Sequence, residues 1–178
     1  MLKLLNVVVM ITLLAVTCES QKFFEVLLDR IEVIYEDKNI VEINARIKKL
    51  NKTRSIVGSV FYHVPFGNDI KIEIQTLKKQ GGEYRYLPYK LLPGPFCDVL
   101  ANDKYLYPDI ARNSDFPEDV MNNCPLPVGN YSLNGLTTNL DNAPLVAAQS
   151  GEYSAECIYY KDDKKVGIYR AYAFINNV

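Results

Sequence analysis

The feature that most constrains the fold is an alternation of apolar and polar side chains with a period of two, which runs through most of the chain after Phe23. In residues 41–48 the odd-numbered positions are Val, Ile, Ala and Ile, and the even-numbered positions are Glu, Asn, Arg and Lys. Residues 70–75 repeat this pattern with three isoleucines. Successive side chains of a strand point to opposite faces, so each segment would place its apolar residues on one face of a sheet.

Further segments rich in β-branched and aromatic residues predict more strands at residues 56–64, 84–91, 131–137, 151–160 and 166–175. The polar tetrapeptide at 161–164 predicts a tight hairpin turn between the last two of them. Strands of this length and spacing are typical of a β-sandwich or a β-barrel. We therefore expect an all-β fold.

Residues 94–123 interrupt the alternation and predict an insert. Phe96, Val99 and Leu100 recur at intervals of three and four, which favours one or two short helical turns. A long irregular insert in a β-domain is usually a functional loop or a cover.

The cysteines predict one disulfide, Cys97–Cys124, because these two residues open and close the insert. Closing a loop of about 28 residues stabilises a fold by roughly 3 to 4 kcal/mol in the chain-entropy model. Two alternatives remain for Cys157: it is a buried free thiol, or it pairs with Cys18 if that residue stays in the mature chain.

The N-terminal segment resembles a signal peptide. It has one lysine, then an apolar run from Leu4 to Val16 that is shorter than the roughly 20 residues needed to span a bilayer, and then small residues. Cleavage could follow residue 17, 18 or 20. We expect residues 1–20 to be the signal peptide and residues 21–178 to form one secreted, extracellular domain without a transmembrane segment.

Two sequons, at Asn51 and Asn130, are predicted glycosylation sites in a secreted chain. The net charge of −1 gives no long-range attraction to nucleic acid, so no nucleic-acid partner is expected.

No pattern typical of an enzyme is present. The single histidine, His63, cannot build a zinc site with these cysteines unless the disulfide is given up. The common nucleophile, metal-binding and phosphate-binding motifs are missing. We expect a non-enzymatic protein without a cofactor, a metal site or catalytic residues.

Four sequence segments carry a resemblance to a known family: L-L-P-G-P-F-C-D-V-L at 91–100, N-C-P-L-P-V-G-N-Y at 123–131, Y-S-A-E-C at 153–157 and V-G-I-Y-R-A-Y at 166–172. In this order they resemble insect secreted proteins of the ML lipid-recognition superfamily, in the branch of the chemosensory CheB proteins, which is similar to the ganglioside activator protein. The resemblance covers nearly all of residues 23–175. It implies an immunoglobulin-like β-sandwich with an apolar cavity between its sheets.

The alternation and the resemblance together predict which residues would line such a cavity. They are the inward-facing strand residues and the apolar residues of the insert: Ile43, Ala45, Ile47, Val60, Ile72, Ile74, Phe96, Leu100 and Phe116. The alternative is that the same residues form a solid core.

Two functions are expected from this reasoning. The first is a secreted binding protein that carries or presents a lipid or another apolar small molecule, with chemosensation as the setting that the resemblance suggests. The alternative is an accessory protein that modulates a membrane receptor or ion channel by protein contact. The 13 tyrosines of the chain suit a protein interface.

Overall fold

The computed structural model describes residues 24–50, 53–104, 106–137 and 149–177. The signal-peptide prediction for residues 1–20, Cys18 and the sequon at Asn51 lie outside these residues. The elements, in chain order, are β1 (Phe24–Glu36), β2 (Val41–Leu50), β3 (Thr53–Tyr62), β4 (Ile70–Gln80), β5 (Glu83–Pro95), α2 (Phe96–Asn102), α3 (Tyr107–Arg112), β6 (Gly129–Leu136), β7 (Gly151–Lys161) and β8 (Lys164–Asn177).

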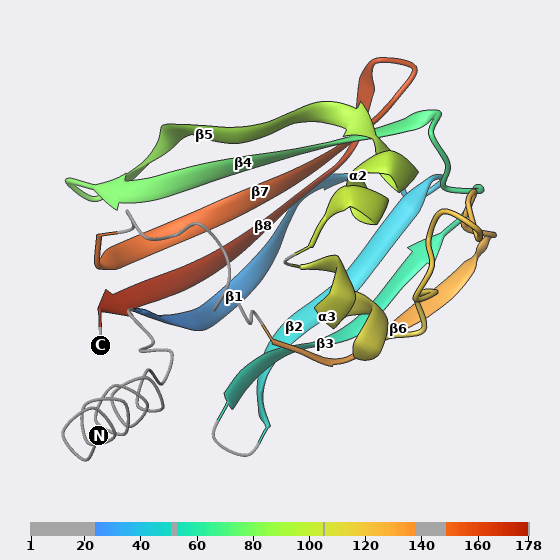
Figure 1. The fold of residues 1–178 in the computed structure, drawn as a ribbon. Helices are drawn as coiled ribbons and strands as arrows, with labels where there is room; N and C mark the ends of the chain where they lie inside the picture. Colours follow the sequence, from blue (N-terminus) through green and yellow to red (C-terminus); the bar gives the residue numbers. More distant parts are fainter. Residues whose placement is uncertain (1–23, 51–52, 105, 138–148, 178) are drawn as a thin grey trace, which may run out of the picture.

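The strands form two antiparallel sheets, which confirms the predicted all-β sandwich (Figure 1). One sheet has the order β1-β8-β7-β4-β5, and the other has the order β2-β3-β6. β7 is therefore the central strand of the larger sheet. β1 also contacts β2 where the chain crosses from one sheet to the other.

Strand register confirms the face assignments drawn from the alternation. On the smaller sheet Ile43 pairs with Val60, so both side chains point into the sandwich. On the larger sheet Ile72 pairs with Tyr159, and Ile74 pairs with Cys157. The predicted turn between the last two strands is also present, with Asp162 and Asp163 at φ values of 50° and 58°.

The insert contains two short helices, as its spacing predicts, and it closes one side of the sandwich. α2 contacts β4 and β5, whereas α3 contacts β6, so the insert lies between the two sheets (Figure 1). The disulfide Cys97–Cys124 is present and joins the start of α2 to the segment before β6. The carboxylate of Asp103 accepts a hydrogen bond of 2.7 Å from the backbone N–H of Tyr107 at the start of α3.

Aromatic rings fill the interior beside the insert. We call this group the aromatic cluster; its members are Tyr62, Phe66, Phe96, Phe116, Tyr131 and Tyr159. Tyr62 stacks on Phe66 with 3.9 Å between the ring centroids, and Phe96 meets Phe66 edge to face at 5.2 Å. Such pairs add about 0.5 to 1.5 kcal/mol each beyond the area they bury. This end of the sandwich is therefore a solid core.

Three strands share a Gly-x-Tyr sequence in which the tyrosine ring lies against the glycine. A Cβ built on the glycine would be 3.9, 3.9 and 2.8 Å from the Cε2 atom of the tyrosine in the pairs Gly129/Tyr131, Gly151/Tyr153 and Gly167/Tyr169, respectively. Only at Gly167 is the approach closer than a real Cβ allows, and there Tyr159 lies 3.2 Å away as well. Gly167 is therefore needed for the packing of two core tyrosines.

Candidate functional site

The structure divides the predicted lining residues into two groups. Four belong to the buried core beside the insert: Val60, Ile72, Phe96 and Phe116. Ile43, Ala45, Ile47 and Ile74 face inward and are half-buried, and Leu100 is half-buried on α2. The first four fit the solid-core alternative, and the inward-facing half-buried residues are the ones placed to line a space between the sheets.

The most informative residue between the sheets is Ala155. Its neighbours on the same face of β7, Tyr153 and Cys157, identify this face as the inner one, because Cys157 packs against the core. Ala155 nevertheless is exposed, although β7 is the central strand of its sheet. Two sheets that pack face to face at about 10 Å fill the gap with interdigitated side chains. An exposed inward residue at the centre of a sheet shows that solvent reaches between the sheets here.

The residues that surround Ala155 on this inner face are small. Thr76 of β4 and Ala171 of β8 are its direct neighbours across the strands, and Ala173 follows one inward step further along β8. All three are half-buried. We call Thr76, Ala155, Ala171 and Ala173 the inner small-residue patch.

The smaller sheet contributes Ala45, Ile47 and Ile56 from the opposite side. Ile47 pairs with Ile56, and both side chains are half-buried inward residues. Ala45 pairs with Gly58, which has no side chain at all. Both sheets therefore present apolar and mostly small side chains at these positions, and none of these residues carries a charge.

Cys157 lies between the inner small-residue patch and the aromatic cluster. It forms no disulfide within the described residues. Burial raises the pKa of its thiol to about 11, so the thiol is protonated and a weak nucleophile at neutral pH. This fits the first alternative, a free thiol packed as a small apolar group, whereas the second involves Cys18, which lies outside the described residues.

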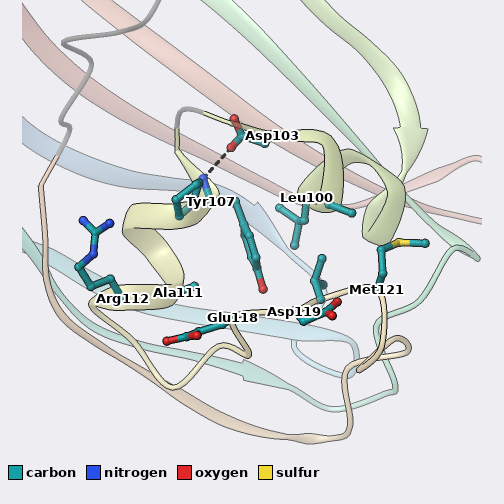
Figure 2. A pocket seen from close by; sticks show the side chains of 11 residues that line it. Leu100, Asp103, Tyr107, Ala111, Arg112, Glu118, Asp119 and Met121 are labelled. Atoms are coloured by element: carbon teal, nitrogen blue, oxygen red, sulfur yellow. Dashed lines mark hydrogen bonds between the residues drawn. The ribbon is translucent and has the colours of Figure 1, made fainter.

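A second candidate site is a surface pocket of about 650 Å³ between α2, α3 and residues 118–121 (Figure 2). The ring of Tyr107 extends from α3 toward the segment that carries Glu118 and Asp119 (Figure 2). Its hydroxyl donates a hydrogen bond of 2.6 Å to the carbonyl oxygen of Pro117, and burial raises the pKa of Tyr107 to about 12. Tyr107 therefore holds the wall of this pocket in place.

The pocket is open to the surface, and both apolar and charged residues line it. Apolar atoms come from Leu100, Ala101 and Met121, and Met121 is 55 % exposed. Acidic groups come from Glu118 and Asp119 at the rim. A surface with exposed apolar and charged groups side by side is more typical of a protein contact than of an enclosed small-molecule site.

The outward face of the larger sheet carries a network of charged and tyrosine side chains. Glu156 is 4 % exposed and accepts hydrogen bonds from Arg170 and from the hydroxyl of Tyr86. Glu73 is 5 % exposed and accepts hydrogen bonds from Gln75 and from the hydroxyl of Tyr160.

The hydrogen bond from Gln75, assisted by the one from Tyr160, lowers the pKa of Glu73 against the opposing effect of burial. Each of these carboxylates has its partners within the sheet. The network therefore stabilises the sheet and offers no free acid or base for chemistry.

Sequence reasoning missed Thr76, Ala155, Ala171 and Ala173 as lining candidates. The signal was present for three of them, because Ala155, Ala171 and Ala173 lie on the inward register of predicted strands, whereas Thr76 follows the predicted segment 70–75. Their side chains are small, so a prediction based on large apolar side chains such as isoleucine and phenylalanine passes over them. Small side chains at inward positions are in fact the ones that leave space.

Three further findings concern the described residues. These residues contain no group of three or more His, Cys, Asp or Glu side chains arranged to hold a metal ion. None of the helices formed by these residues is long and apolar enough to cross a bilayer. The predicted glycosylation site Asn130 is exposed on β6.

Comparison with known proteins gives one family match. No curated protein matches the chain. The match to the family model runs from β4 to β7, so it includes the insert, the disulfide and Ala155. Over residues 72–155 the chain is similar to the family described as "Protein of unknown function (DUF1091)".

Proposed function

We propose that this protein is a secreted, non-enzymatic binding protein that holds an apolar small molecule between its two sheets. The observation that carries the proposal is the exposed, inward-facing Ala155 on the central strand of the larger sheet. Apolar surface that faces solvent inside a sandwich is unfavourable, and an apolar guest removes it from water. The resemblance to the lipid-recognition superfamily supports the same class of ligand.

The hydrophobic effect sets the affinity expected of such a guest. Each buried methylene contributes about 0.8 kcal/mol, so two more methylenes in an alkyl chain should tighten binding about 15-fold. This increase should continue with chain length until the space between the sheets is filled, and it should then stop. A surface depression without an enclosed apolar volume would give no such limit.

The test compares two alanine-to-phenylalanine variants that fill the two candidate sites. Ala155→Phe adds a ring between the sheets, and Ala101→Phe adds the same ring at an exposed position of the pocket between α2 and α3. Binding of N-phenyl-1-naphthylamine, followed by its fluorescence, and its displacement by alcohols of eight to fourteen carbons are measured for both variants and for wild-type protein.

The proposal predicts that Ala155→Phe weakens binding at least about tenfold, because the ring occupies the volume of several methylenes. Ala101→Phe should bind as wild type does. Loss of binding in Ala101→Phe alone would show that the ligand binds in the surface pocket instead. Wild-type protein that binds neither the probe nor any alcohol would refute the proposal.

The alternative function, modulation of a membrane receptor or channel by protein contact, has support from a different surface. Met121 is exposed in the pocket between the helices, which acidic Glu118 and Asp119 also line. A receptor whose capture is lost in Ala101→Phe and kept in Ala155→Phe would favour this alternative over ligand carriage.

A further inference from the structure

A lysine faces the space between the sheets. Lys78 lies on the inner face of β4, two residues beyond Thr76, and it pairs with Tyr153 of β7. Thr76 is the direct neighbour of Ala155 in the same register. Residues two apart in a strand are separated by about 6.6 to 6.8 Å on one face. The backbone of Lys78 therefore lies one inward step beyond Thr76, at the edge of the inner small-residue patch.

No acidic side chain neutralises Lys78 within the described residues. Its Nζ atom donates a hydrogen bond of 3.0 Å to the side-chain oxygen of Gln149 and lies 5.3 Å from the centre of the Tyr153 ring. The neighbouring Lys79 points to the outward face and pairs with Glu152 at 2.7 Å. Lys161, which is also half-buried, pairs with Asp69 at 2.6 Å.

The side chain of Lys78 is half-buried, its ammonium group meets Gln149 at an exposed point, and it lacks a counter-ion in the described part of the chain. An anionic group bound there would form a charge-assisted hydrogen bond, which is stronger than a neutral one. An ammonium group has three donors, and the contact with Gln149 uses one of them. Two donors remain for a group that arrives with the ligand.

We propose that the ligand between the sheets is a single-chain amphiphile with an anionic group at one end, and that Lys78 binds this group. The apolar chain then runs from Lys78 over Thr76 and Ala155 toward Ile74 and Cys157. The hydroxyl of Thr76 offers a second donor at the start of the chain. A carboxylate and a phosphate monoester share the required chemistry. This inference rests on the proposed function, since it names the ligand class of the same site.

The experiment uses ligands that differ only in the head group. Dodecanoate, monododecyl phosphate and dodecanol, each below its critical micelle concentration, are titrated by isothermal calorimetry into the folded protein. The variants are Lys78→Met, which keeps an unbranched side chain without the charge, and Lys78→Arg, which keeps the charge. Lys48→Met is the control, because Lys48 is exposed on the outward face of β2. Thermal unfolding of each variant reports whether it is folded.

The inference predicts that Lys78→Met weakens the binding of the anionic ligands by about tenfold to a hundredfold, the loss expected for a charge-assisted hydrogen bond. Binding of dodecanol should change by less than about twofold in the same variant. Lys78→Arg and Lys48→Met should keep the preference for the anionic ligands. The anionic ligand that loses more affinity identifies the head group.

Two results would overturn the inference and leave the proposed function standing. One is wild-type protein that binds dodecanol as tightly as the anionic ligands. The other is an equal loss for all three ligands in Lys78→Met, which would give Lys78 a purely structural role. Wild-type protein that binds none of the three ligands would overturn the proposed function together with this inference.

Discussion

The disulfide Cys97–Cys124 should account for a large share of the stability of this protein. It joins α2 to the segment before β6 and so fixes the insert against both sheets. The two cysteines are 27 positions apart, so the bond closes a loop of about 28 residues. For this loop length the chain-entropy model gives about 3.6 kcal/mol at 25 °C. That is a substantial fraction of the 5 to 15 kcal/mol that is typical of folded domains.

The perturbation is the double substitution Cys97→Ala/Cys124→Ala, because alanine leaves no polar group at the fully buried position 97. Urea unfolding, followed by tyrosine fluorescence, measures the free energy of unfolding. With a slope of about 2 kcal/mol per molar urea, a loss of 3.6 kcal/mol lowers the midpoint by about 1.8 M. Dithiothreitol should lower the midpoint of wild-type protein by a similar amount and leave the double variant unchanged.

Cys157→Ala is the matched control, since Cys157 is the cysteine that forms no disulfide within the described residues. This variant should keep the sensitivity to dithiothreitol. The reasoning would be refuted if the reductant left the wild-type midpoint unchanged. It would also be refuted if Cys157→Ala became insensitive to reductant, because Cys157 would then take part in the bond that matters.

Three further predictions concern the core and the outward network. Gly167→Ala should lower the free energy of unfolding by about 1 to 3 kcal/mol, because the added Cβ meets the ring of Tyr169 at 2.8 Å. Gly129→Ala is the control: its nearest contact is at 3.9 Å, so it should lower the free energy of unfolding by less than about 0.5 kcal/mol. Equal effects in urea unfolding would contradict this difference. Glu73→Gln should cost about 1 to 2 kcal/mol at pH 7. The pKa of Glu73 is lowered in the folded state, so the difference in free energy of unfolding between the two proteins should be fully present above the unfolded pKa of about 4.3. It should disappear as the pH falls through the pKa of Glu73 in the folded protein. A difference that persists at pH 2 would contradict this prediction. The thiol of Cys157, with its pKa raised to about 11, should react with iodoacetamide at pH 8 more than about 100-fold more slowly in the native protein than in urea. Similar rates in both states would contradict its burial.

Much of the fold could be predicted from local patterns. The alternation in residues 41–48 and 70–75 places the correct side chains inward, because a period of two has one physical meaning in a sheet. The spacing of Phe96, Val99 and Leu100 locates α2. The pairing of Cys97 with Cys124 follows from their places at the two ends of the insert.

The site was harder to predict, because the division between core and lining depends on which residues meet across the two sheets. Val60 and Ala45 lie on the same inner face of neighbouring strands, yet Val60 is 6 % exposed in the core and Ala45 is only half-buried. Rings that come from distant segments, such as Phe96 and Phe116, decide which inward positions are covered. No local pattern in the strands contains that information.

The sequence alone also did not predict that Lys78 and Lys79 have different environments. Lys78 and Lys79 are adjacent, and a charged pair of this kind is usually solvated on both residues. The strand alternation places one of them outward, where it meets Glu152, and turns the other into the sandwich. Only the register of β4 with β7 distinguishes them.

A crystal structure of the protein with 12-bromododecanoate would show whether a ligand lies between the two sheets. Anomalous scattering locates the bromine atom at the end of the alkyl chain without reference to any assumed pose. We expect a bromine peak between the sheets, deeper than Ala155 and close to Ile74 and Cys157. Bromine peaks confined to the outside of the sandwich, for example in the pocket between α2 and α3, would contradict it.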